Sequence, residues 1–519
     1  MAKPKTPNQK RKYGELNKRL AKYVMLVESI YEDLNLEAAK IVGITDFTID
    51  SDRTFMWSDY PQTRKRIRDL QERFVEDIGS VIYSGTSEEW KNSNEVQDLL
   101  ANKVLQTYGA TIGKEKYEIL YQPNNDALKA FQQRKDKGFT ISDKLWNQST
   151  LYKQELEEAI SCAIQKGTSA ITLSKQISKY LLDFPQLQKD YKERFGKASR
   201  AMDCEYRSIR LAASEINMAY RQAENLRWQQ MDFVVGYEIK LSNNHTCNGK
   251  PFQDICDILA GKYPKDFQWT GWHPLCRCYK IPILKTEEEF WEWDGRNEAT
   301  TASVNEVKDV PDAFKKWVLD NQERISTAKK RNTLPYFLRD NKSVYQKITV
   351  ESSISEIVKR ASSVGDEVQS IAERIAIKNG GYVTPINFKS TTSITRKVIT
   401  EGITPYDIKG AVRTTIIVPK SRIEDVLEEL YKTEGFLRLK RQKPESFMGY
   451  SGNIVNIRTT NGLTAEIQVN TERMIFAKER PEDAKRILGK KRWEEIHNET
   501  GMEGGLGHKY YEQWSILDK

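Results

Sequence analysis

The stretches AVRTTIIV, residues 411–418, and LTAEIQV, residues 463–469, decide the fold of the C-terminal part of the chain. Both are short and rich in β-branched residues, which is typical of strands. Two further strands are expected at GFLRLKRQ, residues 435–442, and GNIVNIRT, residues 452–459. The four segments predict a sheet.

Helical spacing surrounds these strands. We expect one helix over about residues 354–378, another at SRIEDVLEELYK, residues 421–432, and more at the C-terminal end. The pair Asn461-Gly462 is typical of a hairpin turn. Residues 351–519 are therefore predicted to form an α+β domain with a mixed sheet.

The whole chain has 519 residues, which is too long for one hydrophobic core. We expect a helical region with a basic arm over 1–140, an α+β module over 141–285 and a connector over 286–350 before the C-terminal domain. The fold class is thus multidomain, with a mainly α N-terminal half. Hydrophobic residues make up 38%, which excludes wholesale disorder, and no apolar run is long enough to be a membrane segment or signal peptide.

The N-terminus is strongly basic. Residues 1–22 hold eight Lys or Arg against one acid, Glu15, and the whole chain carries a net charge of +9. Such an arm suits phosphate or an acidic protein surface, and one interpretation is a DNA-binding packaging factor whose affinity falls with salt. The alternative is a solvated, frayed terminus.

A long amphipathic helix is predicted from about Asp203 to Met231, followed by a strand at VVGYEIKL, residues 234–241. The apolar positions of this helix recur at spacings of 4, 3, 4 and 3, at Ile209, Ala213, Ile216, Tyr220 and Ala223. The segment after the strand, residues 242–282, is irregular and rich in Gly, Pro, Trp and Cys. This composition indicates a small subdomain that is held together by cross-links.

That segment contains candidate metal ligands, namely Cys247, Cys256, His273, Cys276 and Cys278. Thiolates and imidazole are the ligands that zinc selects, and two short segments could close a tetrahedral structural site. The spacing departs from the standard zinc patterns, because a single residue separates the last two cysteines. Buried free thiols, or a disulfide formed after release from the cell, are the alternatives.

Three segments of this region resemble the head-morphogenesis family of phage minor head proteins named after the F protein of phage Mu. They are RLAASEINMAYRQAENLRW (210–228), YEIKLSNNHTCNGKPF (237–252) and WHPLCRC (272–278). The resemblance implies a few copies near the portal vertex of the virion, made in the host cytoplasm. It implies roles in head assembly and in DNA packaging or exit. The portal and other head or neck proteins would be its partners, and the basic arm could contact phage DNA.

The C-terminal domain carries a second set of candidate residues. Lys389, Ser393 and Lys397 are spaced by four on a predicted helical face after a strand, where cations and the helix dipole could grip a polyphosphate. The alternative for the two lysines is solvated surface charge.

Further along, carboxylates, a cation and an aromatic follow, namely Asp407, Arg413, Tyr450, Glu466 and Gln468. Glu466 and Gln468 alternate along one strand and so share a face. Two carboxylates, cations and an exposed aromatic are what magnesium-dependent phosphoryl or pyrophosphoryl transfer requires. Taken alone, Tyr450 would be interpreted as a half-buried side chain that packs against its neighbours.

The order of these residues resembles the synthetase domain of the RelA/SpoT family over about residues 354–516. The matching motifs are FKSTTSITRK (388–397), DIKGAVRTTIIV (407–418), MGYSGNIVNI (448–457), EIQVNTERMIFAKE (466–479) and GLGHKYYE (505–512). The resemblance implies a nucleotidyltransferase-like domain that uses ATP and Mg²⁺. It would move pyrophosphate to a ribose 3′-hydroxyl of a guanine nucleotide or a tRNA end.

By the same resemblance, Lys389 and Lys397 would hold the ATP phosphates, and Tyr450 would stack on the acceptor base. Glu466, with an acid near Asp407, would hold magnesium or activate the acceptor hydroxyl. The sequence departs from the family pattern in three places. Asn387 stands where the family has Arg, Ile454 where it usually has His, and Asp407 lies one residue further from Arg413 than usual.

The sequence supports two candidate functions. The first is a minor head protein of a tailed phage that carries an effector-like C-terminal domain. The second is a pyrophosphotransferase, acting as an alarmone synthetase or a toxin. We take the head protein as the main interpretation, because a free enzyme of this kind needs neither the long N-terminal part nor the Cys/His segment.

Overall fold

The computed structural model describes residues 6–44, 54–108, 114–163, 170–242, 246–247, 250–251, 253–292, 302–441 and 452–506. The chain divides into two compact units, Met1–Tyr345 and Gln346–Lys519. The helical region, the α+β module and most of the connector that the sequence distinguishes therefore share one unit. Within the described ranges, no helix combines the length and the apolar character that crossing a membrane requires.

The first unit is mostly helical. Its helices are α1 (Gln9–Ile44), α2 (Arg64–Tyr108), α3 (Lys114–Leu120), α4 (Asn125–Gln133), α5 (Ile141–Ala163), α6 (Ala170–Leu182), α7 (Phe184–Phe195), α8 (Cys204–Gln230), α9 (Ile255–Leu259), α10 (Glu287–Glu292), α11 (Asp312–Asp320), α12 (Gln322–Lys330) and α13 (Tyr336–Arg339). Its strands are β1 (Val234–Lys240), β2 (Thr246–Cys247), β3 (Lys250–Pro251), β4 (Gly261–Tyr263) and β5 (Tyr279–Leu284).

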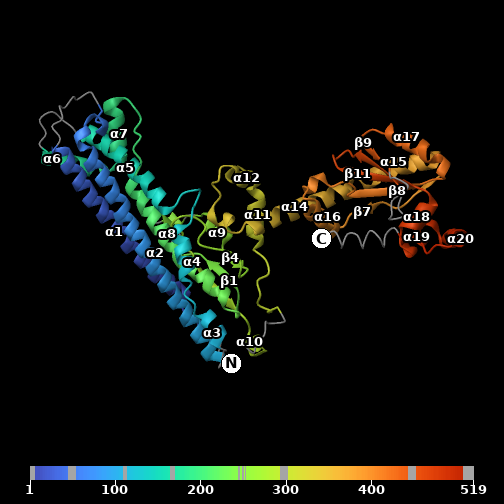
Figure 1. Ribbon diagram of the computed structural model, residues 1–519, viewed down its shortest axis with the longest axis horizontal. Coiled ribbons are helices and arrows are strands. Elements are labelled where there is room, and N and C mark those ends of the chain that lie inside the picture. The colour runs from blue at the N-terminus through green and yellow to red at the C-terminus, as the bar shows by residue number, and fades with distance from the viewer. Residues whose placement is uncertain are drawn as a thin grey trace. The chain divides into compact units, whose positions relative to one another are not determined.

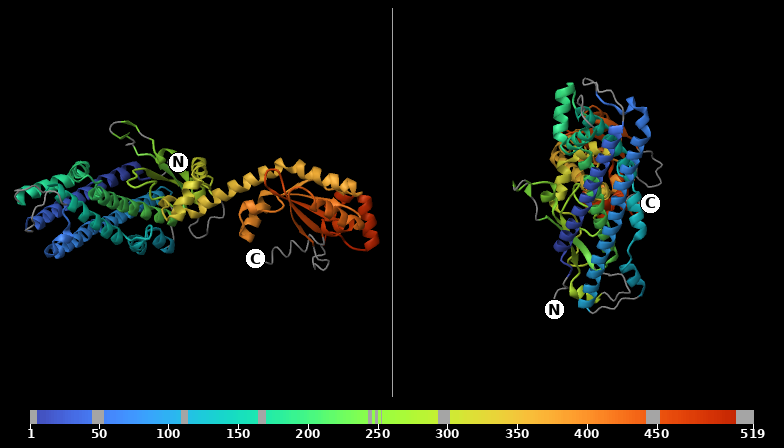
Figure 2. Two further views of the ribbon diagram at one scale, coloured as in Figure 1. Left: turned by 90° about the horizontal axis from the view of Figure 1, so that it is seen from above. Right: turned by 90° about the vertical axis from the view of Figure 1, so that its left-hand side faces the viewer.

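Helix α8 confirms the long helix predicted after Asp203, and Asp203 caps it by accepting a hydrogen bond from the backbone N–H of Tyr206 at 2.9 Å. Its apolar positions Ile216 and Tyr220 are fully buried. Figures 1 and 2 show α8 lying beside the long helices α1 and α2, and the three helices contact one another. Strand β1 follows as predicted and pairs antiparallel with β4 and β5.

Helix α2 is longer than the sequence indicates. The pattern over residues 1–140 predicts helices broken by polar loops, yet α2 runs for 45 residues through the polar stretch around residues 84–95. Some polar side chains of this stretch, among them Glu89 and Asn94, are buried and have partners from elsewhere in the unit. Arg19 of the basic arm, for example, pairs with the buried Glu89 at 2.6 Å, and Arg227 donates to Asn94 at 2.9 Å. Tertiary contacts thus stabilise helix where local composition favours a loop.

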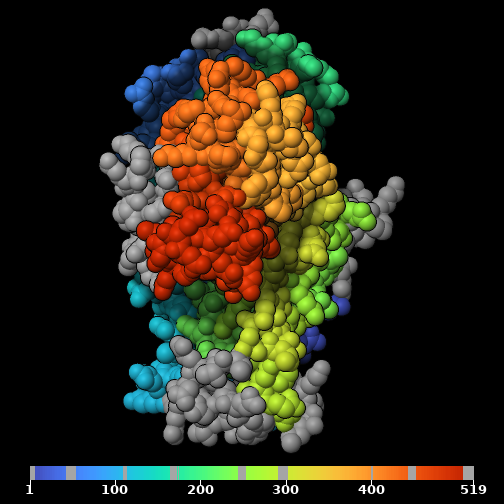
Figure 3. All heavy atoms as spheres, turned by 90° about the vertical axis from the view of Figure 1, so that its right-hand side faces the viewer, coloured from blue at the N-terminus to red at the C-terminus, as the bar shows by residue number. Residues whose placement is uncertain are grey.

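The second unit is an α+β fold. Its helices are α14 (Lys342–Ser363), which begins just before the boundary, α15 (Gly365–Lys378), α16 (Thr391–Glu401), α17 (Ile423–Tyr431), α18 (Glu472–Lys478), α19 (Pro481–Leu488) and α20 (Lys490–Thr500). Its strands are β6 (Tyr382–Val383), β7 (Asn387–Phe388), β8 (Val412–Ile417), β9 (Phe436–Lys440), β10 (Asn453–Arg458) and β11 (Thr464–Asn470). Figure 3 shows the C-terminal helices, in red, on one face of this unit.

The four predicted strands are confirmed as β8, β9, β10 and β11, and they form one mixed sheet. The strand order is β6-β8-β11-β10-β9, with β7 also paired to β8. The β8–β11 pair is parallel, and the other pairs are antiparallel. On one face, buried residues such as Val412, Ile467 and Val455 pack in one core with residues of α15 and α17. The opposite face is polar.

The single helix expected over 354–378 is divided into two helices, because α14 ends at Ser363 and α15 begins at Gly365. A Cβ atom at Gly365 would come within 2.8 Å of the Phe388 ring, which lies on β7. The break at Val364 therefore lets the end of β7 pack closely on the start of α15. This contact joins distant segments, so the local spacing of apolar residues does not reveal it.

The buried carboxyl of Glu155, in the first unit, leads to a testable prediction. Burial raises the pKa of Glu155 to about 8, and its carboxylate faces the backbone N–H of Cys204 at 3.3 Å. Between its ordinary pKa and about 8, folded Glu155 holds a proton that the unfolded chain releases. Raising the pH through this window should therefore destabilise the fold.

Glu155→Gln removes this titration and keeps the acceptor. We expect its free energy of unfolding to match that of the wild type at pH 5 and to exceed it at pH 8, measured by urea unfolding followed by circular dichroism. Identical pH profiles for the two proteins would contradict the burial of a proton at Glu155.

Candidate active site

The polar face of the second unit's sheet carries a row of paired side chains. The strand register sets Arg413 of β8 beside Glu466 of β11 and beside Asn387 of β7, and sets Glu466 beside Asn456 of β10. Directly paired residues share a face of the sheet. Arg438 of β9 continues the row, because its Nε donates to Asn456 Oδ1 at 3.3 Å. Cation, carboxylate and amide therefore lie side by side across five strands.

A short chain of hydrogen bonds orients Glu466. Gln468, which lies on the same face of β11, donates from Nε2 to Glu466 Oε1 at 2.6 Å. Lys478, at the end of α18, donates from Nζ to Gln468 Oε1 at 2.8 Å. Because these bonds hold Oε1, the other carboxylate oxygen, Oε2, is left to face Gly410.

Gly410 makes room for that carboxylate. Its φ of +72° lies in the left-handed region, and a Cβ atom there would come within 2.9 Å of Glu466 Oε2. Oε2 therefore packs against bare backbone at Gly410. A carboxylate oxygen is the ligand that magnesium prefers, so Glu466 is the residue of this row that would hold the ion.

Cations gather around this carboxylate. Lys389 is half-buried, and burial together with the neighbouring charges of Lys397 and Arg413 lowers its pKa, while Glu466 acts in the opposite direction. The backbone N–H of Lys389 donates to the carbonyl of Ala411 at 2.9 Å, which fixes the lysine beside β8. Several like charges held together attract an anion with several charges of its own.

The structure corrects the helical face expected for Lys389, Ser393 and Lys397. Helix α16 begins at Thr391, and Ser390 caps it by accepting a hydrogen bond from the Ser393 backbone N–H at 3.2 Å. Ser393 and Lys397 are thus on the helix, whereas Lys389 lies before it. The three residues still flank the N-terminal turn of α16, where the helix dipole favours negative charge.

One predicted site residue, Asp407, is not joined to Glu466, and another, Tyr450, falls outside the described residues. Asp407 ends the short 3₁₀ turn Pro405–Asp407, is exposed, and accepts a hydrogen bond from Thr404 Oγ1 at 2.7 Å. Across the described parts of the chain, no hydrogen bond or ion pair joins it to Glu466. Tyr450 lies outside the described residues, as does His508 of the closing motif.

Sequence reasoning did not single out Lys478, Gly410 or Asn456. A signal for Asn456 was present, since it is a polar residue at a buried position between the apolar Val455 and Ile457 of one strand. Gly410 and Lys478 act through residues on other elements. Their roles therefore depend on the strand order, which the sequence does not show.

The predicted Cys/His ligands lie in the first unit. The thiols of Cys256, Cys276 and Cys278 are within 4.8 Å of one another, and Cys256 also forms a group with Asp254 and His273. The backbone of the fifth predicted ligand, Cys247, is in β2, but its side chain lies outside what the structure describes.

Comparison with known proteins relates part of the chain to one enzyme. Over 160 residues it is 33% identical to the (p)ppApp synthetase toxin Tas1 of Pseudomonas aeruginosa, which is 31% of this chain and 36% of that protein. The chain therefore spans about a third of the length of this relative. No protein-family model matches the chain. We assign the match to the second unit, because its residues carry the motifs described above.

Among solved structures, the complex of the type VI effector Tas1 with its immunity protein aligns at 32% identity and a TM-score of 0.29, covering 32% of this chain and 85% of that one. A GTP pyrophosphokinase family protein from Streptococcus pneumoniae aligns at 19% identity and a TM-score of 0.21, covering 32% and 91%. About a third of the chain is thus a RelA/SpoT-like domain on the sequence match. None of these matches supports the head-protein interpretation of the first unit.

Gly410→Ala tests whether Gly410 makes room for Glu466. The substitution should cost about 1–3 kcal/mol through its left-handed backbone, and more because the Glu466 carboxylate must move. Gly402→Ala is the matched control, because Gly402 has a φ of +62° and a Cβ atom there would meet nothing within 4 Å. Equal losses of unfolding free energy in urea would contradict the close approach at Glu466.

Proposed function

We propose that the second unit transfers the β,γ-pyrophosphate of ATP to the 3′-hydroxyl of an adenine nucleotide. The observation that carries the proposal is the cross-strand pair of Arg413 and Glu466, with Lys389 and Lys397 beside it. Cations that could hold phosphate and a fixed carboxylate lie on one face of the sheet. The sequence match to a (p)ppApp synthetase toxin supports the same reaction class and favours adenine over guanine.

Lys389, Lys397 and Arg413 would hold the phosphates of the donor, ATP. Lys389 and Lys397 flank the first turns of α16, so they and its N-terminal backbone N–H groups can bind the triphosphate together. Burial and the charge of Lys397 lower the pKa of Lys389, and bound phosphate would offset both. Arg413 is exposed on β8 and offers two parallel donors to one phosphate group.

Glu466 has the central role in the transfer. The acceptor oxygen attacks the β-phosphorus of ATP, the bond between that phosphorus and the α,β-bridging oxygen breaks, and AMP leaves. The free Oε2 of Glu466 would either hold magnesium or accept the proton of the attacking hydroxyl. Magnesium bound there would neutralise phosphate charge. Gln468 and Lys478 keep the carboxylate oriented before substrate arrives, which is how positioned groups contribute to rate.

Glu466→Gln tests this assignment. With the full chain, labelled ATP and magnesium, we expect transfer to an adenine nucleotide to fall at least about a hundredfold, because a positioned charged group is lost. Glu424→Gln is the matched control, since Glu424 is an exposed carboxylate of the same unit paired with Arg441 at 2.6 Å. Guanine nucleotides and total tRNA serve as alternative acceptors in parallel reactions.

Each outcome of this assay is decisive. Transfer to adenine nucleotides that Glu466→Gln abolishes supports the proposal in full. Transfer to guanine nucleotides or tRNA alone would overturn the acceptor assignment and keep the reaction class. Absence of transfer to every acceptor would overturn the catalytic proposal.

For the first unit we retain the head-protein interpretation as a second proposal. It is supported by the WHPLCRC motif. In this motif the backbone carbonyls of Cys276 and Cys278 accept hydrogen bonds from Arg221 of α8. The portal and other head or neck proteins would be its partners, the virion its location, and DNA a further contact through the basic arm. If this is correct, the full chain co-purifies with intact virions through a density gradient. Its absence from virions of a producing lysogen would contradict the proposal.

A further inference from the structure

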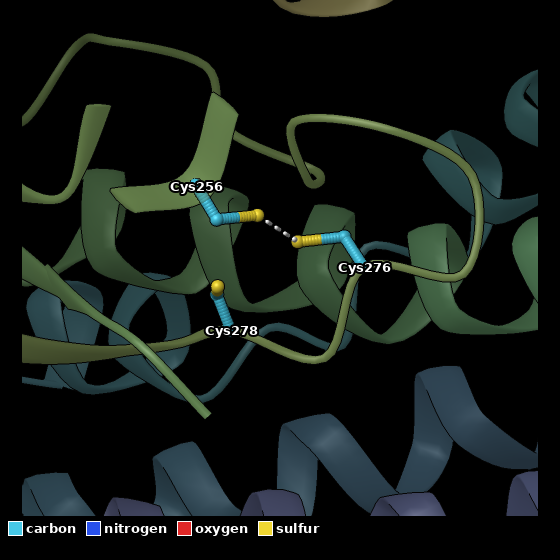
Figure 4. A group of neighbouring side chains, drawn as sticks. All are labelled: Cys256, Cys276 and Cys278. Carbon is cyan, nitrogen blue, oxygen red and sulfur yellow. Dashed lines mark hydrogen bonds between the residues drawn. The ribbon is translucent and has the colours of Figure 1, made fainter. Parts of the chain in front are cut away.

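Three buried thiols converge in the first unit. Cys256 lies on α9, Cys276 in the segment between β4 and β5, and Cys278 immediately before β5. Figure 4 shows their sulfur atoms pointing toward one another, and Cys256 Sγ lies 3.8 Å from Cys276 Sγ. Two thiolates bound to one tetrahedral ion with bonds of about 2.3 Å are roughly 3.8 Å apart. The observed spacing is that of two ligands of a common ion.

His273 adds an imidazole to this group. Its Nδ1 lies 2.7 Å from the carbonyl of Pro274, to which it donates when protonated. That bond leaves the other nitrogen, Nε2, to face Cys256 Sγ at 3.1 Å and the carboxylate of Asp254 at 3.3 Å. A metal-binding histidine usually has its second nitrogen held in this way.

The backbone between the histidine and the second cysteine is strained. Leu275 has a φ of +61°, a left-handed conformation that costs a non-glycine residue about 1–3 kcal/mol. Such strain persists where the surroundings fix the conformation. Here Leu275 lies in the turn between His273 and Cys276. The turn brings both of these residues next to Cys256.

A buried cation lies behind the thiols. Arg221 of α8 is 1% exposed, and its guanidinium donates to the carbonyls of Thr270, Cys276 and Cys278 at 2.7–3.0 Å. Among the described residues no carboxylate forms an ion pair with it, and its buried Nε has no hydrogen-bond partner. A buried charge needs compensation. Three thiolates and one divalent ion leave a single negative charge, which offsets Arg221.

We propose that Cys256, Cys276, Cys278 and His273 bind one structural zinc ion, with Arg221 as its charge-balancing neighbour. Sulfur and imidazole ligands select zinc over magnesium or calcium, which require oxygen. The ion would join α9 to the segment before β5 and hold both against α8. A disulfide between Cys256 and Cys276 is the competing state, and it would require the sulfurs to approach to about 2.05 Å.

The test uses the full chain purified under reducing conditions. Elemental analysis should find about one zinc per chain, as a site with four protein ligands predicts. Replacement of zinc by cobalt should give the thiolate charge-transfer band and the visible bands of a tetrahedral site. This second measurement needs no variant, so it does not depend on whether a cysteine variant folds.

Variants then assign the ligands. Cys276→Ser and Cys278→Ser should lose the metal, whereas Cys162→Ser, a buried free cysteine outside the cluster, should retain it. A cobalt spectrum unchanged in His273→Asn would overturn the assignment of His273. Metal-free protein with freely titratable thiols, or a Cys256–Cys276 disulfide found by mass spectrometry, would overturn the site. None of these results depends on the transfer activity of the second unit.

Discussion

The parallel pairing of β8 with β11 is the constraint on which the second unit depends. It sets Arg413 beside Glu466 on one face and turns Val412 and Ile467 toward α15 and α17 on the other. Side chains alternate along a strand, so a shift of one residue would bury the charges and expose the core. The hydrophobic packing that stabilises the sheet therefore also fixes the register of the polar row.

The rest of the site refines what this pairing establishes. Gln468, itself held by Lys478, fixes one oxygen of Glu466, and Gly410 makes room for the other. Lys389 and Lys397 add positive charge from a different element, α16, whose first turn is capped by Ser390. The positive charges exceed the carboxylate they surround, so the arrangement is suited to a polyphosphate ligand.

The sequence predicts the parts of this unit better than their arrangement. Short segments rich in β-branched residues predicted β8 and β11, and the spacing of Glu466 and Gln468 predicted their common face. The parallel pairing, the break at Val364 and the role of Gly410 depend on contacts between distant segments, which local patterns do not encode. In the first unit, helices were predicted but the continuity of α2 was not, because partners such as Arg19 stabilise its polar stretch. Clustering of cysteines predicted a site, and only the structure relates it to Arg221.

A crystal structure of the full chain with a non-hydrolysable ATP analogue and magnesium would show where the donor binds. We expect the triphosphate on the polar face of the sheet, contacted by Lys389, Lys397 and Arg413, with the ion at Glu466 Oε2. An analogue bound elsewhere, or a triphosphate without contact to these cations, would contradict the proposed site.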